Sequence, residues 1–207
     1  ALSSHMNRAK EALNGEVARF AKQYVQQKKW GDLEIKFDEF IKIPQEYQFR
    51  LLSAALLWVS GKVYRPRFNS LERLLNALTS RSIGRGRSLM GCLIKCDGEN
   101  IKLSREFSAI AKPILAVNSK FVWEKNWQLV VDFEKLNNTM IGPLGKEGLK
   151  QIENNKSFLV PSNALICSVA MFENEQVLCL PIISYGSGLK STLIGGTESF
   201  LNFVLTY

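Results

Sequence analysis

The chain has 207 residues, of which 46% are hydrophobic and 22% charged, so it is long enough to bury one large core or two small ones. This composition excludes disordered and fibrous classes. The only histidine, His5, lies in residues 1–6, which we interpret as a tag-derived remnant ahead of the natural sequence. Catalysis and metal binding that require histidine are therefore excluded, and we predict no catalytic, cofactor or metal site in this chain.

The net charge of +8 is distributed unevenly. Residues 1–115 hold 20 basic side chains against 11 acidic ones, whereas residues 116–207 hold 7 against 8. The highest density falls in residues 60–87, where seven basic side chains accompany a single acid, Glu72. Such a positive field favours an anionic partner, nucleic acid in particular.

No apolar run approaches the roughly 20 residues of a membrane-spanning helix, and no signal peptide is recognisable. We therefore expect a soluble, cytoplasmic protein that has no membrane partner. The cysteines stand in apolar, strand-like surroundings without a CxxC pair, which favours buried free thiols over disulfides or zinc. There are four of them: Cys92, Cys96, Cys167 and Cys179.

Helical periodicity dominates the first part of the chain. Apolar residues recur at helical spacing from Ala9 to Tyr24, and residues 32–37 suit a short extended piece. A second helix is predicted from Pro44 to Val59, with Gly61 ending it.

A third helix is predicted to begin at Asn69, whose side chain would cap it, with Glu72 in the capping-box position. Its apolar stripe is Leu71, Leu74, Leu75 and Leu78, so Arg73 should face solvent.

Alternating hydrophobicity replaces helical periodicity after residues 80–88, a polar stretch that we interpret as a domain boundary. Asp97-Gly98 suits a type I′ turn between two strands. The remaining expected elements are hairpins at 92–105, 121–133 and 165–183, a short helix at 145–153, and a last stretch that suits either strand or helix.

The sequence thus predicts an α+β fold with a helical region at 7–87 and a small β-rich α+β domain at 88–207. Several aromatic residues sit where apolar stripes predict a core position. They are Phe20, Tyr47, Trp58, Trp123, Trp127 and Phe133.

The basic segment has the side chains that bind a phosphate backbone, because arginine presents a planar fork of donors to phosphate oxygens. Pro66 restricts the backbone between two arginines, and Gly84 and Gly86 would let the second loop approach a ligand closely. The alternative is an ordinary solvated basic surface, and whether Tyr64 stacks on a base stays open. The predicted nucleic-acid-binding residues are Lys62, Tyr64, Arg65, Arg67, Arg73, Arg81, Arg85 and Arg87.

Two other motifs favour structure over chemistry. Residues 186–192 lack the adjacent Gly-Lys of a phosphate loop and suit a flexible turn. A thiol nucleophile at Cys167 or Cys179 would have no histidine to activate it.

Six stretches, in order and covering nearly the whole chain from about residue 9, resemble tRNA(Ile)-lysidine synthetase, particularly its alphaproteobacterial members. In this family's pattern Ser88 and Met90 stand where Thr and Gly are usual, and the turn at 124–126 lacks the expected Gly-Arg, which leaves its role open. The stretches are Val63-Tyr-Arg-Pro-Arg67 with Leu71-Glu-Arg-Leu74, Ser88-Leu-Met-Gly-Cys92, Ser104-Arg-Glu106, Val122-Trp-Glu-Lys-Asn-Trp127, Leu144-Gly-Lys-Glu-Gly-Leu149, and Leu180-Pro181.

The resemblance implies the tRNA-recognition portion of an ATP-dependent ligase that joins lysine to the anticodon cytidine of tRNA(Ile) with a CAU anticodon. The family's catalytic domain carries a Ser-Gly-Gly-x-Asp-Ser pyrophosphate loop, which these residues lack, so ATP and magnesium are expected in that domain and no cofactor here. Rival interpretations are a protein-interaction or general RNA-binding module and, less favoured, a self-contained enzyme. The oligomeric state stays open, with a homodimer as one alternative.

Overall fold

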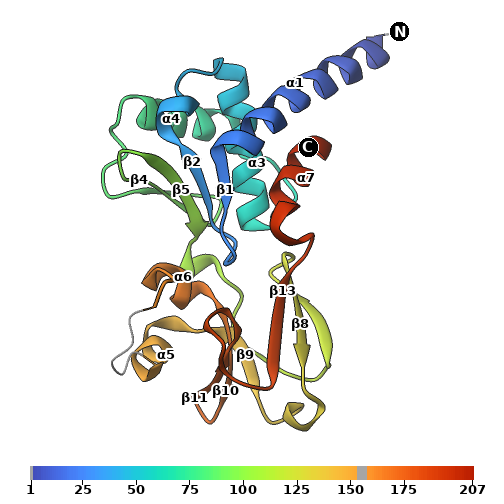
Figure 1. The fold of residues 1–207 in the computed structure, drawn as a ribbon, viewed down its shortest axis with the longest axis vertical. Helices are drawn as coiled ribbons and strands as arrows, with labels where there is room; N and C mark the ends of the chain where they lie inside the picture. The colour runs from blue at the N-terminus through green and yellow to red at the C-terminus, as the bar shows by residue number, and fades with distance from the viewer. Residues whose placement is uncertain (1, 153–157) are drawn as a thin grey trace. The chain divides into compact units, whose positions relative to one another are not determined.

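The structure is a computed structural model that describes residues 2–152 and 158–207. It divides the chain into two compact units (Figure 1). Unit 1 comprises residues 1–104 and 197–207, and unit 2 comprises residues 105–196. No helix in the described ranges is both long and apolar enough to cross a membrane.

Unit 1 contains the three helices that the sequence predicted, and two shorter helices in addition. The first predicted helix begins earlier than expected and includes residues 2–6, and the third begins at Phe68. The helices are α1 (Leu2–Tyr24), α2 (Phe37–Phe40), α3 (Gln45–Ser60), α4 (Phe68–Thr79) and α7 (Ser199–Thr206), after the 3₁₀ turn Gly196–Glu198.

The ends of α3 and α4 show where capping predictions hold and fail. Pro44 precedes α3 and Gly61 ends it in the left-handed conformation at φ 65°, as predicted. The cap predicted at Asn69 is wrong. The carbonyl oxygen of Arg67 accepts the amides of Ser70 and Leu71, so α4 starts earlier, at Phe68, whose ring packs 5.2 Å from that of Phe49.

A five-stranded antiparallel sheet completes unit 1, in the order β1-β2-β5-β4-β3. Its buried face carries Leu33, Ile35 and Ile101, and the thiol of Cys92 on this face donates a hydrogen bond to the Leu56 carbonyl of α3 at 3.5 Å. The strands are β1 (Val25–Gln27), β2 (Leu33–Lys36), β3 (Arg87–Leu89), β4 (Cys92–Cys96) and β5 (Asn100–Arg105).

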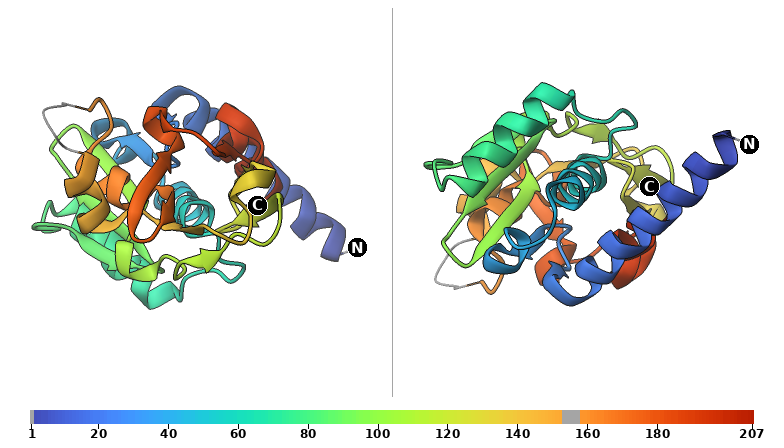
Figure 2. Two further views of the ribbon diagram at one scale, coloured as in Figure 1. Left: turned by 90° about the horizontal axis from the view of Figure 1, so that it is seen from below. Right: turned by 90° about the horizontal axis from the view of Figure 1, so that it is seen from above.

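The division between units differs from the predicted boundary at 87/88. Strand β5 pairs with β2, with Leu33 opposite Leu103, so residues 87–104 complete the sheet of the helical region. At the other end of the chain α7 lies beside α1 in both views of Figure 2 and also packs on α3, where the Phe200 and Trp58 ring centroids are 5.7 Å apart. The hydrophobic periodicity of a single segment gives no information on which distant segment it pairs with.

The hairpin of β4 and β5 is confirmed, but its turn is not of type I′. Gly98 has a φ of 96°, whereas Asp97 is outside the positive-φ region that type I′ requires. Instead, Oδ1 of Asp97 accepts the backbone amides of Glu99 at 3.2 Å and Asn100 at 2.8 Å, which is an Asx turn.

Unit 2 contains two antiparallel sheets and two short helices, with one core between the sheets and another beneath the helices. The sheet orders are β12-β11-β10-β9-β6 and β13-β8-β7. The strands are β6 (Ile114–Leu115), β7 (Lys120–Trp123), β8 (Trp127–Val131), β9 (Met140–Pro143), β10 (Val169–Glu173), β11 (Gln176–Leu180), β12 (Tyr185–Gly186) and β13 (Leu189–Leu193). The helices are α5 (Gly145–Ile152) and α6 (Ser162–Cys167), with 3₁₀ turns at Phe107–Ala109, Phe133–Lys135 and Pro181–Ile183.

Most predictions for unit 2 are confirmed. The hairpins β7-β8 and β10-β11 and the helix α5 are present, although the predicted end of that helix at Glu153 lies outside the described residues. Two ends of the predicted hairpin at 165–183 are wrong: residues 165–167 end α6, and residues 181–183 form a 3₁₀ turn after β11. The final stretch forms both a strand, β13, and a helix, α7.

The predicted core aromatics are mostly correct. Phe20, Trp58 and Trp123 are buried, and Tyr47 and Trp127 are partly buried. The core position predicted for Phe133 is wrong, because β8 ends at Val131 and the following 3₁₀ turn leaves the ring 85% exposed.

No disulfide joins the four cysteines, all of which lie in the described residues, and this confirms the prediction, but only two of them are buried. Cys92 and Cys179 lie in the cores, and burial raises the pKa of the Cys179 thiol. Cys96 and Cys167 are half-buried, which corrects the prediction for them.

The turn between β1 and β2 holds a carboxyl group with an unusual titration. Burial raises the pKa of Asp32 to about 7, although Nε1 of Trp30 opposes the shift by donating a hydrogen bond to its carboxylate at 2.9 Å. Between pH 4 and pH 7 the folded chain therefore holds a proton that the unfolded chain releases. The free energy of unfolding should fall as pH rises through this window, by at most about 1.4 kcal/mol per pH unit.

Urea unfolding at pH 5 and pH 8 tests this contribution. Asp32→Asn should remove the decline and make the chain more stable at pH 8 than the unaltered chain. Asp97→Asn is the matched control, because the Lys102 ammonium at 2.7 Å lowers the pKa of Asp97. Its contribution has the opposite sign and is lost on acidification, so identical pH profiles for the two variants would contradict the assignment.

Candidate nucleic-acid interface

All eight predicted nucleic-acid-binding residues have exposed side chains. They belong to the segment between α3 and α4, to α4 itself, to the loop after α4 and to β3. We call the seven basic members the basic cluster: Lys62, Arg65, Arg67, Arg73, Arg81, Arg85 and Arg87.

Helix α4 sets the extent of the basic cluster. Its leucine stripe is buried as predicted, which turns Arg73 outward. Twelve residues of α-helix are about 18 Å long, so the arginines before α4 and those after it stand well apart. The cluster can therefore contact several successive phosphates of an extended backbone.

Arg65 is held by a residue that sequence reasoning missed. Its guanidinium lies 4.2 Å above the centre of the Tyr207 ring, and Nη2 donates to the Tyr207 carbonyl at 3.2 Å. The hydroxyl of Tyr207 is in turn 2.5 Å from Oγ of Ser53 in α3. A guanidinium stacked by its face keeps donors at its edge for a phosphate.

Arg81 is the member least suited to bind phosphate. It occupies the left-handed position after α4 at φ 53°, where its amide bonds to the Leu78 carbonyl. Its guanidinium forms an ion pair with Asp38 at 3.5 Å and lies 4.4 Å above the Phe37 ring. Asp38 is distant in sequence, so the local charge count overlooked this neutralisation.

Among the described residues, the other members of the cluster have no acidic partner. Arg73 donates to the carbonyl of Asn69 at 3.1 Å, and Arg87 reaches the carbonyl of Arg73 at 3.5 Å, which places these two arginines together. Across residues 2–152 and 158–207, Arg81 is the only member of the cluster in an ion pair. The remaining six cations are thus available to an anionic ligand.

Lys95 is a further exposed cation that the prediction omitted. Gly86 packs against β4 so closely that a Cβ there would lie 2.9 Å from Cγ of Lys95 and 2.9 Å from the Ile94 carbonyl oxygen. Gly86 is therefore required by the chain's own sheet, whereas a Cβ on Gly84 would meet nothing within 4 Å. Alternation along β4 was the available signal, because Lys95 follows buried Ile94 onto the outer face.

The glycine-containing motif at 186–192, predicted as a flexible turn, is mostly strand: Gly186 ends β12, and only Ser187-Gly188 lie between β12 and β13. Leu189–Leu193 form β13, in which Lys190 pairs with Val130. A Cβ on Gly186 would lie 1.7 Å from the Leu178 carbonyl oxygen, so close backbone packing accounts for this glycine.

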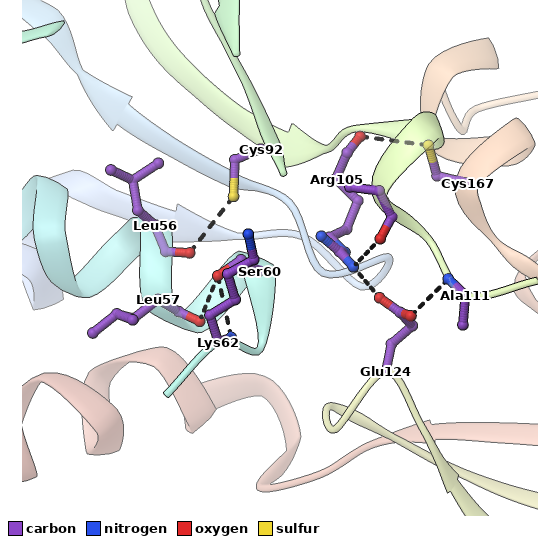
Figure 3. A network of polar contacts seen from close by, with 10 residues as sticks. Leu56, Leu57, Ser60, Lys62, Cys92, Arg105, Ala111, Glu124 and Cys167 are labelled. Carbon is purple, nitrogen blue, oxygen red and sulfur yellow. Dashed lines mark hydrogen bonds and ion pairs between the residues drawn. The ribbon is translucent and has the colours of Figure 1, made fainter. Parts of the chain in front are cut away.

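The turn at 124–126, whose role the sequence left open, places the Glu124 side chain in contact with Arg105 and Ala111 of unit 2 (Figure 3). The carboxylate of Glu124 forms an ion pair with Arg105 and accepts the amide of Ala111 at 2.9 Å. Nη2 of Arg105 also donates to the Ala109 carbonyl at 3.1 Å. The Arg105 and Glu124 side chains are only 18% and 17% exposed, so this turn has a structural role.

Comparison with known proteins gives the same family as the motifs do. No family model matches the chain. It is similar to the tRNA(Ile)-lysidine synthase of Wolbachia pipientis wMel, with 28% identity over 87% of this chain and 42% of the relative. The synthase of the Wolbachia of Brugia malayi is 31% identical over 69% of this chain and 33% of the relative.

A third relative, the tRNA(Ile)-lysidine synthase of Ruegeria pomeroyi, is 28% identical over 100% of this chain and 47% of its own length. The resemblance that the sequence motifs predicted is confirmed. The chain spans less than half the length of each of these relatives.

Proposed function

The chain belongs to the tRNA(Ile)-lysidine synthase family, and on that premise we propose that it forms the C-terminal, tRNA-binding portion of such an enzyme. The complete enzyme would attach lysine to the anticodon cytidine of tRNA(Ile) with a CAU anticodon. ATP and magnesium would bind in the catalytic domain, whose Ser-Gly-Gly-x-Asp-Ser motif is absent from these 207 residues.

The basic cluster carries this proposal. Its members lie at both ends of α4 and along it, and six of the seven have no ion pair in the described part of the chain. Cations left without acidic partners gain most from contact with a phosphate backbone, since that contact releases condensed counterions. These contacts fix the position of an RNA and carry no sequence information themselves.

A salt titration of binding tests the proposal. The 207-residue chain is titrated with isoleucine tRNA bearing the CAU anticodon, with methionine tRNA and with double-stranded RNA of similar length. We expect both tRNAs to bind more tightly than the duplex, because the proposed surface recognises the shape of a folded tRNA. The association constant should fall by roughly 0.7 to 0.9 logarithmic units, per phosphate contact, for each tenfold rise in salt.

Other results have distinct meanings. Tighter binding of isoleucine tRNA than of methionine tRNA would place discrimination within this chain. Equal binding of duplex and tRNAs would indicate a general RNA-binding module, and absence of binding to all three RNAs would reject the proposal.

A further inference from the structure

The segment joining α3 and α4 exposes apolar as well as basic side chains. Val63 is 72% exposed, Tyr64 85% and Phe68 61%. They are interspersed with Lys62, Arg65 and Arg67 within seven residues. Large apolar side chains gathered on a surface mark an interaction site, and the surrounding cations indicate an anionic ligand.

The aromatic ring of Tyr64 is largely exposed to solvent. Its side chain makes no hydrogen bond or ring contact with the described residues, whereas the ring of Phe68 packs partly on Phe49. Tyr64 is therefore available to a ligand at little cost in packing.

The backbone that carries Tyr64 is held on both sides. Gly61 ends α3 with its amide bonded to the Leu57 carbonyl, and Arg67 is the N-cap residue directly before α4. Between them, Pro66 restricts the chain, and Arg65 is stacked on the Tyr207 ring 4.2 Å away. A ligand would meet a segment that needs little further ordering.

We propose that the segment 62–68 binds an unpaired nucleotide of the tRNA, with the base stacked on Tyr64 and the flanking phosphates contacted by Arg65 and Arg67. This inference rests on the proposed function and names the RNA feature that the segment recognises. In an A-form duplex the bases are stacked on each other and the major groove is too narrow for side chains, so a ring reaches a base face only where the base is unpaired. An aromatic platform beside cations is the usual arrangement for binding single-stranded nucleic acid.

The effect of Tyr64 on binding can be separated from that of charge. Removing one base-stacking ring weakens binding by roughly 5- to 150-fold. Because tyrosine carries no charge, Tyr64→Ala should leave the salt dependence of binding unchanged. Tyr64→Phe keeps the ring and should bind within about 2-fold of the unaltered chain.

The experiment measures binding of the unaltered chain, Tyr64→Ala and Tyr64→Phe to isoleucine tRNA and to a fully paired RNA duplex, each at three salt concentrations. Phe133→Ala is the matched control, because its ring is also 85% exposed but lies in unit 2. We expect only Tyr64→Ala to lose affinity, and only for the tRNA.

Each of the other possible results would contradict a specific part of the proposal. If Tyr64→Ala binds tRNA with unchanged affinity, or loses affinity equally for the duplex, then Tyr64 does not stack on an unpaired base. The proposed function would still stand in that case, provided that the unaltered chain binds tRNA in a salt-dependent way. If Phe133→Ala weakens binding as much as Tyr64→Ala does, the site assignment is wrong. If the unaltered chain binds no RNA, the proposed function itself fails.

Discussion

Replacing Arg65 and Arg67 together by glutamate is expected to weaken tRNA binding by roughly 100-fold at low salt, because two charge-assisted phosphate contacts are lost and two repulsions replace them. The slope of the logarithm of affinity against the logarithm of salt concentration should decrease by about two. Binding isotherms at several salt concentrations measure both quantities.

The matched control for this charge reversal is the pair Lys120→Glu and Lys190→Glu, which changes the net charge equally. Both lysines are exposed and lie on the same face of the β13-β8-β7 sheet in unit 2, opposite Val130 of the central strand. This pair should have a small effect. Equal loss of affinity in the two double variants would mean that total charge governs binding, and the basic cluster would lose its assignment.

The single variant Arg67→Glu tests whether the lost affinity comes from a lost phosphate contact or from a disturbed fold. Arg65 contacts Tyr207, so its replacement also disturbs the packing of α7, whereas the Arg67 side chain makes no polar contact within the described residues. Arg67→Glu should keep the melting temperature of the unaltered chain and lower the salt slope by about one. Unchanged affinity in this variant would contradict phosphate contact by Arg67.

The second large effect is expected from Glu124→Ala. This change leaves the guanidinium of Arg105 and the amide of Ala111 without the carboxylate that they share. Breaking a fully buried ion pair costs about 3–5 kcal/mol, and the partial exposure of both side chains reduces the expected loss to about 2–3 kcal/mol. Glu124→Gln should cost less, because its amide oxygen can still accept the Ala111 amide.

Hydrogen exchange locates this loss of stability. The amides of β7 and β8, which flank the turn, should exchange roughly 30- to 150-fold faster in Glu124→Ala under conditions where exchange reports the opening equilibrium. The amides of β4 and β5 in unit 1 serve as the internal reference. Lys125→Ala alters the same turn at an exposed residue and should change stability by less than about 0.5 kcal/mol. Equal effects of the two substitutions would show that turn geometry, and not the carboxylate, stabilises unit 2.

The sequence predicted which residues belong to the candidate site better than it predicted the contacts that those residues make. Clustered basic residues indicated a surface, and all of them are exposed. The differences among them depend on partners elsewhere in the chain. Asp38 neutralises Arg81, and Tyr207 supports Arg65 across 142 residues of sequence. A count of nearby charges contains no information on either contact.

Local features of the fold followed from the sequence alone. The helix Gln45–Ser60 could be predicted because proline and glycine stand at its two ends, and α4 because leucines recur with helical spacing. The hairpins followed from alternation around polar turns. Such patterns depend on interactions between residues a few positions apart, and the sequence displays those directly.

Tertiary structure decided which segments belong together. Strand β5 pairs with β2 of the helical region, and α7 packs beside α1, so the units divide at residues 104/105 and 196/197. The sequence determined that helices, hairpins and an exposed basic surface would form. Only long-range strand pairing and core packing could decide their grouping, because the free energy that selects one pairing comes from burying faces that are distant in sequence.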